Sequence, residues 1–366
     1  MRYPGLITGP QKNVGEQEYG WDYGRMSIDG KKSIDPMLNL GCYTLGYGRM
    51  AIMNYVHNNM CIKPEVAENF FDAQPIKLNN ATWKLAKMLK GITGYRSIFS
   101  LSGSDAMEGA VKLASAYQQQ VGQHQRNGIV TFKDSYHGST LLTQSMGDSM
   151  LNDPYTMKPY QNILRLPVDF YVDHYDWDSI MCVVVETCPY ANGIKPHSER
   201  FWNNISQIQK KGVIIIVDDI MTGGGKTGNF VGWKKLPVEP DIFTMGKAIT
   251  GGYFPLSIAL YNDKIHDALP RRFEWEHGFT YSFSLPGILS CLAYVKILEE
   301  ELLMKKHRDI VVRAVDLFNN LGYTIKGQFG TIIEIEREQR GMYTIPIDAS
   351  DEYFYVLEQQ LKGRLL

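Results

Sequence analysis

The stretch from Gly212 to Leu260, GVIIIVDDIMTGGGKTGNFVGWKKLPVEPDIFTMGKAITGGYFPLSIAL, decides the fold. Its run of β-branched residues, Val213 to Val217, predicts a strand buried on both faces of a parallel sheet. Two acids end the run, and the first is Asp218. In open α/β sheets ligands bind at the carboxyl ends of the strands, so this acid is a site candidate. A second apolar run, Asp241 to Met245, leads to Lys247 among glycines, where a ligand can approach closely.

One buried acid and one accessible amine on neighbouring strand ends suit pyridoxal phosphate chemistry. The amine forms a Schiff base with the cofactor aldehyde, and the acid keeps the pyridinium nitrogen protonated so that the ring draws electrons. Burial has to lower the pKa of Lys247 before its amine can act as nucleophile and base. The alternative interpretation is that Lys247 is a solvated loop lysine. Further sequence features along the chain that are typical of a cofactor site argue against it.

Two segments of this stretch, DDIMTGGGKTG and VEPDIFTMGKAITGG, resemble the signature of the class III aminotransferases, which are pyridoxal phosphate enzymes of fold type I. The resemblance implies that Asp218 holds the pyridinium nitrogen, that Ile220 packs under the ring and that Lys247 carries the cofactor. Gly225-Lys226-Thr227 is not a P-loop, since that motif needs a glycine where Ile220 stands.

The resemblance spans residues 15 to 335 and implies an α/β fold. A large domain has a mostly parallel, doubly wound sheet, and both termini build a small α+β domain. Residues 1–55 are expected to be the N-terminal part of the small domain, 56–285 the large cofactor-binding domain, and 286–366 a shortened C-terminal part.

Periodicity and turn residues predict the individual elements. The expected helices are 80–90, 106–118, 198–210, 286–306 and 309–321, and the expected strands are 98–101, 129–132, 181–186 and 331–336, after short strand-like pieces at 20–23, 26–29 and 33–38.

A Ser-Gly turn leads into the expected helix 106–118 and carries Gly103 and Ser104. Such a turn offers backbone N–H groups and a hydroxyl at the positive end of a helix, which suits a phosphate, although a plain helix cap has the same sequence. It resembles the family motif S-G-[ST]-E-A, with Asp105 in place of the usual glutamate. The resemblance makes Gly103 and Ser104 phosphate ligands.

The resemblance implies cofactor contacts for three further residues. The motif Y-H-G-S-T implies that Tyr136 stacks on the ring opposite Ile220 and that His137 lies beside the cofactor, although His137 could also be a satisfied loop histidine. Glu186 ends the expected strand 181–186 and is placed near the ring oxygen and the acid on the nitrogen. These motifs look most like the diaminopelargonate aminotransferase branch. Tyr43 and Tyr47, in a glycine-rich loop, are either pocket walls or packing residues.

The segment H-G-F-T-Y resembles an element that crosses to the other subunit in this family, where Thr280 binds the phosphate. A homodimer follows from that resemblance. The chain then departs from the family pattern, because Phe283-Ser284-Leu285 replaces G-[NH]-P, and a bulky Phe283 should reshape the substrate entrance.

Composition excludes several classes of protein. The 38 basic and 39 acidic residues give a net charge of -1, which argues against a nucleic-acid or anionic-membrane surface. The five cysteines lack C-x-x-C spacing and no H-E-x-x-H occurs, so neither a disulfide framework nor a metal site is predicted. No signal core or membrane-length apolar run is apparent, and a cytoplasmic protein is expected.

The sequence therefore predicts a transaminase that moves an amino group from an amine or amino acid to a keto or aldehyde acceptor. An intramolecular aminomutase of the glutamate-1-semialdehyde type, or a non-catalytic relative, are the alternatives. No R-x-x-P-P-like segment offers an arginine for a substrate carboxylate, so the donor is not assigned. Lys226, Arg271 and Arg272 are the candidates for that contact.

Overall fold

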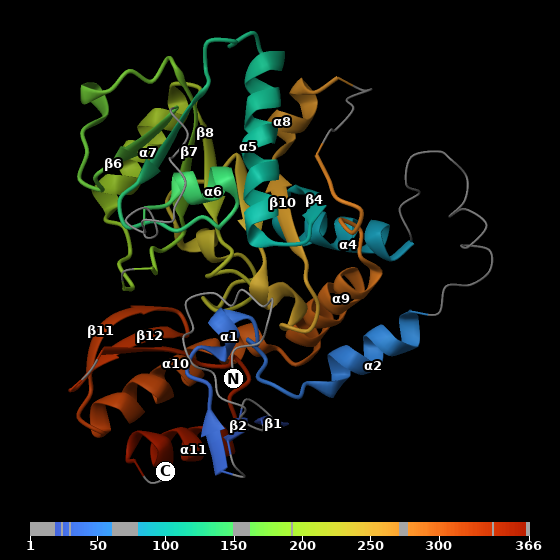
Figure 1. Ribbon diagram of the computed structural model, residues 1–366, viewed down its shortest axis with the longest axis vertical. Coiled ribbons are helices and arrows are strands. Elements are labelled where there is room, and N and C mark those ends of the chain that lie inside the picture. Colours follow the sequence, from blue (N-terminus) through green and yellow to red (C-terminus); the bar gives the residue numbers. More distant parts are fainter. Residues whose placement is uncertain are drawn as a thin grey trace, which may run out of the picture.

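The computed structural model describes residues 19–22, 25–28, 31–60, 80–148, 162–191, 193–270, 277–338 and 340–363. Within these ranges three sheets form, with strand orders β1-β2-β3, β4-β10-β9-β8-β7-β5-β6 and β11-β12-β13. Figure 1 shows the seven-stranded sheet and its helices in one part of the molecule, and β11, β12, α10 and α11 gathered in another.

The seven-stranded sheet is mostly parallel, because only β10 runs antiparallel to its neighbours β4 and β9. Its strands are β4 (Arg96–Ser100), β5 (Gly128–Phe132), β6 (Ile163–Leu166), β7 (Ile180–Glu186), β8 (Ile214–Asp218), β9 (Ile242–Met245) and β10 (Ser257–Tyr261). The helices of this part are α4 (Asn80–Thr93), α5 (Gly103–Gln120), α6 (Leu141–Met146), α7 (Glu199–Lys210), α8 (Asp263–Ala268) and α9 (Leu285–Glu300), with short 3-10 turns η2 (Val172–His174), η3 (Gly232–Lys235) and η4 (Lys247–Thr250). The predicted α/β fold with a mostly parallel sheet is confirmed.

The two faces of the sheet explain the continuous apolar runs of β7 and β8. Alternate residues such as Val184 and Ile216 pack with α5 in one cluster, and the residues between them, such as Val185 and Ile215, pack with α7 in another. Because both faces are covered, every position of these strands is buried and must be apolar until the chain reaches the site. Each fully buried isoleucine or valine contributes about 1.5–3 kcal/mol relative to an exposed one.

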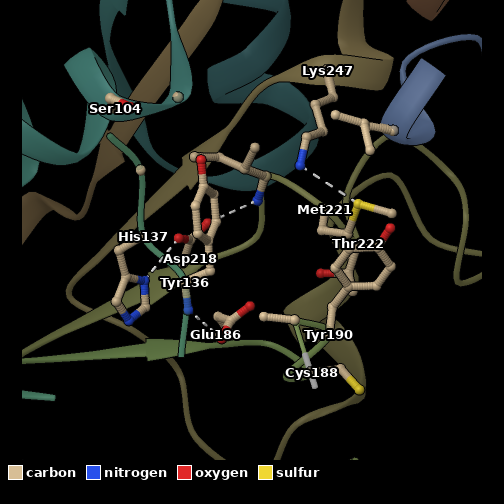
Figure 2. Close-up of a pocket in the computed structure, with 15 residues that line it drawn as sticks. Ser104, Tyr136, His137, Glu186, Cys188, Tyr190, Asp218, Met221, Thr222 and Lys247 are labelled. Carbon is tan, nitrogen blue, oxygen red and sulfur yellow. Dashed lines mark hydrogen bonds and ion pairs between the residues drawn. The ribbon is translucent and has the colours of Figure 1, made fainter. Parts of the chain in front are cut away.

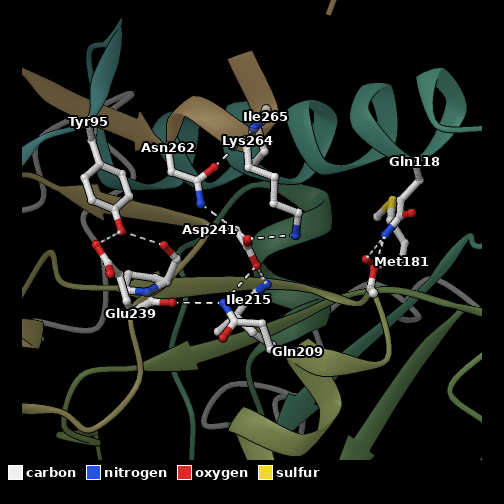
Figure 3. A network of polar contacts seen from close by, with 12 residues as sticks. Tyr95, Gln118, Met181, Gln209, Ile215, Glu239, Asp241, Asn262, Lys264 and Ile265 are labelled. Atoms are coloured by element: carbon white, nitrogen blue, oxygen red, sulfur yellow. Dashed lines mark hydrogen bonds and ion pairs between the residues drawn. The ribbon is translucent and has the colours of Figure 1, made fainter. Parts of the chain in front are cut away.

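A polar network lies at the amino end of the seven-stranded sheet, where β9 begins (Figure 3). Asp241, only 2% exposed, accepts hydrogen bonds from Ile215 N (3.0 Å) and from Lys264 Nζ (3.0 Å). Gln209 of α7 donates to the same carboxylate at 3.2 Å. This acid therefore fixes helices to the amino end of the sheet and leaves the carboxyl ends of the strands to the site.

The remaining elements come from both ends of the chain. They are β1 (Tyr19–Asp22), β2 (Arg25–Ile28), β3 (Lys31–Ile34), α1 (Leu38–Gly41), α2 (Met50–Asn59), α10 (Leu303–Asn320), β11 (Thr324–Phe329), β12 (Ile332–Glu336), β13 (Arg340–Thr344) and α11 (Asp351–Leu361). The backbone of Ile34 exchanges two hydrogen bonds with the side chain of Gln360 in α11, at 2.7 and 3.1 Å. The N-terminal strands thus lie against the C-terminal helix, while the domain boundaries at 55 and 285 stay predictions.

Several predicted details are wrong. Trp83 has the spacing of the apolar face of the predicted helix 80–90 but is 62% exposed, since α4 buries Leu85 and Leu89 instead. The predicted helix 286–306 is interrupted at Leu302, which has φ 52° and separates α9 from α10. The strand-like piece 33–38 ends at Ile34, and Leu38–Gly41 forms a left-handed turn. Among the described helices, none has the length and apolar character needed to cross a membrane.

Candidate active site

A cavity of about 350 Å³ lies where the carboxyl ends of β7, β8 and β9 meet the N-terminus of α5 (Figure 2). Strand pairing places Glu186 beside Asp218, and Asp218 beside Thr244. The cavity is lined by Leu40, Gly103, Ser104, Tyr136, His137, Gly138, Glu186, Cys188, Tyr190, Ala191, Asp218, Ile220, Met221, Thr222 and Lys247.

Asp218, the last residue of β8, is 7% exposed and faces this cavity. Its Oδ2 lies 2.9 Å from His137 Nδ1, and its Oδ1 accepts a hydrogen bond from Ile220 N at 3.2 Å. The two contacts fix the orientation of the carboxylate, so that it can receive a positively charged nitrogen without reorganising.

Asp219 points away from the cavity. It accepts hydrogen bonds from the hydroxyls of Thr187 (2.8 Å) and Thr222 (2.5 Å) and from Gly232 N (2.7 Å). Burial raises the pKa of Asp219 to about 6, and these hydrogen bonds oppose the rise. Of the two acids at the end of the strand, Asp218 therefore faces the cavity and Asp219 stabilises the fold.

Glu186 lies next to Asp218 at the end of β7 and accepts a hydrogen bond from Tyr136 N at 3.2 Å. Burial, and then the neighbouring charge of Asp218, raise the pKa of Glu186 well above its ordinary value. Two carboxylates this close do not both ionise easily in a buried site, so Glu186 is the one disposed to hold a proton.

Lys247 follows β9 and begins η4. Its backbone is left-handed, with φ 50°, a conformation that costs a non-glycine residue about 1–3 kcal/mol and often occurs at functional sites. Its Nζ reaches into the cavity and lies 3.6 Å from Met221 Sδ. Burial lowers the pKa of Lys247, while Asp218, Cys42 and Glu186 act in the opposite direction. The amine is therefore easier to deprotonate than that of a solvated lysine.

The N-terminus of α5 supplies the phosphate-sized end of the cavity. Ser102 caps the helix, since its hydroxyl accepts a hydrogen bond from Asp105 N at 3.2 Å. Ser104 Oγ accepts a hydrogen bond from Ser139 N at 3.0 Å. A Cβ on Gly103 would lie 2.8 Å from Ile220 Cδ1, so only glycine lets the isoleucine approach this turn. The free N–H groups of the first helical turn suit an anion.

Tyr136 and Ile220 are the two bulky side chains proposed to enclose a planar ring, and both line the cavity. Tyr136 is 39% exposed despite its size, and Figure 2 shows its ring beside Asp218. An aromatic ring left open in this way can stack on a ligand.

Some predicted residues lie elsewhere. Thr280 is exposed and does not line the cavity of its own chain. Tyr43 and Tyr47 pack against each other with their rings tilted by 33° and the ring centroids 4.1 Å apart, and they are not part of the lining either. Lys226 is fully buried and does not line the cavity, while Arg271 and Arg272 lie outside the described residues.

Sequence reasoning missed the side of the cavity formed by Leu40, Cys188, Tyr190, Ala191 and Met221. Met221 could have been found, because it follows Ile220 directly in the loop after β8. Leu40 could not have been found. It reaches the cavity from a left-handed turn of non-glycine residues, which local sequence patterns do not predict.

The cavity fits pyridoxal phosphate by its chemistry: an amine with a lowered pKa, a carboxylate held for a cationic nitrogen, and a helix N-terminus for a phosphate. A volume of about 350 Å³ lies in the usual range for small-molecule sites. No group of three histidine, cysteine or acidic side chains that could hold a metal occurs among the residues described. Fold and cavity together define the class of pyridoxal phosphate-dependent transferases.

Comparison with known proteins identifies the family. The family Aminotransferase class-III matches residues 24–353. An uncharacterized aminotransferase, y4uB, of Sinorhizobium fredii is 26% identical in an alignment of 310 residues that covers 77% of this chain and 66% of that protein. Adenosylmethionine-8-amino-7-oxononanoate aminotransferase of Aquifex aeolicus is 28% identical in an alignment of 323 residues that covers 80% of this chain and 69% of that protein. The chain thus spans about two thirds of the length of these relatives.

Solved structures agree on the fold. The amine transaminase of an uncultivated Pseudomonas species, in its PLP-bound form, superposes with a TM-score of 0.82 at 19% identity and covers 100% of this chain and 98% of that one. The chain belongs to the class-III aminotransferases, and it is accordingly a transaminase that uses pyridoxal phosphate.

Proposed function

We propose that Lys247 is the residue that holds pyridoxal phosphate, and that Asp218 binds the ring nitrogen. The observation that carries this proposal is the meeting of Glu186, Asp218 and Lys247 in one cavity, from the ends of three strands that are neighbours in the sheet. Gly103 and Ser104 are the proposed phosphate ligands, because they open α5 at the far end of this cavity.

When bound, the cofactor supplies an electron-withdrawing ring. The residues of the chain then have distinct tasks. Lys247 Nζ, with a pKa lowered by burial, would accept a proton from the substrate carbon and deliver it to the carbon on the cofactor side of the shared nitrogen. Asp218, held by His137, keeps the ring nitrogen protonated. Glu186, with its raised pKa, can donate a hydrogen bond from its carboxyl to an oxygen on the ring. Tyr136 and Ile220 enclose the ring and exclude water.

The substrate is proposed to be an amine whose reacting carbon carries an apolar group. Support comes from the cavity lining, where Leu40, Met221 and Ala191 offer hydrocarbon or thioether surface and Tyr190 offers an aromatic ring. Among the lining residues that the structure describes, Lys247 is the one lysine and no arginine occurs, so a substrate carboxylate has no bidentate partner there.

The proposal includes a homodimer in which Thr280 completes the phosphate site of the partner subunit. Its support is the exposure of the turn that carries Thr280, where Phe279 and Tyr281 are 55% and 68% exposed. Large apolar side chains gathered on a surface favour a covered interface. A cytoplasmic location and the division at residues 55 and 285 also belong to the proposal, and they rest on the sequence alone.

A half-reaction assay tests the proposed function. The cofactor-loaded protein is mixed with single amines or amino acids, and conversion of the bound cofactor to its amino form is followed by absorbance. We expect conversion with apolar primary amines to exceed conversion with α-amino acids such as glutamate by at least about 10-fold, a difference of about 1.4 kcal/mol. Preference for glutamate would contradict the proposed substrate class.

The same assay separates the alternatives. An aminomutase turns over a single amino-aldehyde substrate without any added keto acid, whereas a transaminase stops after one conversion until an acceptor is supplied. A protein that binds the cofactor but converts it with none of the amines would be a non-catalytic relative, and the proposed function would then be wrong.

A further inference from the structure

The turn Leu38–Gly41, which is α1, has an unusual backbone. Leu38, Asn39 and Leu40 have φ angles of 47°, 50° and 55°, and none of the three is glycine. Asparagine adopts this left-handed conformation readily, but leucine does not, because its Cβ then comes too close to the following carbonyl oxygen. Several such residues in succession persist only where neighbouring groups hold them, and they are typical of functional sites. The conformation of the turn therefore has to be stabilised from outside it.

Asp35 accepts three hydrogen bonds that hold the turn. Its Oδ1 accepts one from Met37 N at 2.9 Å, and its Oδ2 accepts one from Asn39 N at 2.6 Å. The hydroxyl of Tyr47 donates the third to Oδ2, at 2.5 Å. Burial, and then the hydrogen bond to Asp35, raise the pKa of Tyr47, so its hydroxyl stays a donor at neutral pH. Hydrogen bonds to a carboxylate are stronger than those between neutral groups, so this one side chain fixes the start of the turn.

The residues before and after Leu40 are packed in the interior. Leu38 is fully buried. Gly41 follows Leu40 with φ 79°, and its backbone lies so close to Met221 that an added Cβ would be 3.0 Å from Met221 Cε. Met221 itself lines the cavity. Both ends of the turn are thus held, and the place of Leu40 depends on the left-handed conformation between them.

Leu40 is part of the wall of the cavity that contains Lys247. Its side chain lines this cavity and is 59% exposed, so a ligand in the cavity meets its hydrocarbon surface. The same segment reaches the lining a second time, because the hydroxyl of Tyr190 donates a hydrogen bond to Met37 Sδ at 3.7 Å. The turn also contacts η4, which begins at Lys247. A segment from the N-terminal part of the chain therefore supplies one wall of the candidate active site.

A hydrocarbon wall discriminates between ligands by size only while it stays in place. One methylene more or less in a hydrophobic pocket changes kcat/KM about 10- to 200-fold. That discrimination needs side chains whose positions are locked by packing and by supporting hydrogen bonds, since a wall that moves aside by about 1 Å admits the larger ligand. Asp35 does not line the cavity, so its effect on a substrate must pass through the turn that it holds.

We propose that Asp35 is a positioning residue that sets the size of the amine accepted by this site, because it holds the left-handed turn in which Leu40 forms a fixed wall of the cavity. The inference rests on the proposed function, which assigns an apolar amine to the cavity, and it adds the element that limits the size of that amine. The hydrogen bonds of the turn are a property of the chain itself.

The first test measures a size ratio, defined as kcat/KM for 1-phenylpropan-1-amine divided by kcat/KM for 2-aminobutane, in the half-reaction of the cofactor-loaded protein. Leu40→Ala should raise the size ratio about 10-fold, because a smaller wall admits the larger amine. Asp35→Ala should raise it by about the same factor, since the released turn takes Leu40 out of the wall. In the double variant the ratio should stay about 10-fold above the wild type and not rise about 100-fold, because both changes remove the same wall.

The second test follows hydrogen exchange of the peptide 36–41 in the full chain without cofactor. The N–H groups of Met37 and Asn39 lose their acceptor in Asp35→Ala, so their exchange should become at least about 10-fold faster. Leu40→Ala should leave that exchange within about 2-fold of the wild type, since the acceptor is still present. If Asp35→Ala does not fold, Asp35→Asn, which keeps one acceptor oxygen, should give a smaller change in the same direction in both tests.

Asp351→Ala is the matched control, because it removes an exposed aspartate paired with Arg313, and it should change neither the size ratio nor the exchange. Equal losses for both amines in Asp35→Ala, with an unchanged ratio, would leave Asp35 a structural role and overturn the inference. So would a ratio in the double variant equal to the product of the two single effects. If the wild type converts neither amine, the proposed function fails together with this inference, whereas an unchanged ratio in a protein that converts both amines overturns this inference alone.

Discussion

Replacing Asp218 and Asp219 separately by asparagine should show that the first acid is needed mainly for activity and the second mainly for stability. Asp218→Asn keeps an oxygen for Ile220 N, so the free energy of unfolding should fall by less than about 1 kcal/mol. An amide cannot keep a ring nitrogen protonated, and the transfer rate should fall about 100- to 1000-fold, the usual loss when one fixed electrostatic partner is removed.

Asp219→Asn should have the opposite effect, with a large loss of stability and a small loss of activity. Three donors converge on this buried carboxylate, from Thr187, Thr222 and Gly232. Asparagine replaces one acceptor oxygen by a donor, so at least one hydrogen bond to a charged group is lost, and each contributes about 1.5–3 kcal/mol. The free energy of unfolding should fall by about 2 kcal/mol, while the activity of the folded fraction stays within about 10-fold of the wild type, since Asp219 points away from the cavity.

Urea denaturation followed by circular dichroism, and kcat/KM at a urea concentration of zero, measure the two effects on the same preparations. Equal losses of stability in the two variants, or a larger loss of activity in Asp219→Asn than in Asp218→Asn, would refute the assignment of the two acids.

Three further predictions concern single residues. Gly91→Ala, in α4 with no atom within 4 Å of the added Cβ, should raise the free energy of unfolding by about 0.5–1 kcal/mol in the same denaturation assay. Gly103→Ala, in contrast, forces Ile220 out of its rotamer and should weaken cofactor binding about 10-fold, measured by absorbance titration; unchanged affinity would contradict the close approach. Burial lowers the pKa of His197 to about 4 from 6.5, so between these values the unfolded chain binds a proton that the folded chain does not. Stability should therefore fall as the pH drops from about 6.5 to 4, by at most about 3 kcal/mol from this residue, and His197→Phe should flatten the pH dependence of unfolding in this window.

The parts of the fold that local pattern determines could be predicted from the sequence. The all-apolar runs of β7 and β8 follow from burial on both faces, and the acids that end them follow from the position of the site at the strand ends. Neighbouring strands then bring Glu186 and Asp218 together through register alone.

Features set by distant contacts could not be predicted. The helix is interrupted at Leu302 without a glycine or proline at the break, and Trp83 satisfies the helical spacing yet is exposed. Lys226 is fully buried, and Gly41, which is far from it in the sequence, lies so close that an added Cβ would be 3.3 Å from Lys226 Cε. The pattern of residue types therefore predicted the candidate acid and amine, but not the burial of a second lysine.

Hydride reduction of the cofactor-loaded protein, followed by proteolysis and peptide mass spectrometry, tests the central claim most directly. We expect a single modified peptide with the reduced cofactor on Lys247, and none in Lys247→Ala. Modification of Lys226 or of any other lysine in place of Lys247, or no modification at all, would contradict it.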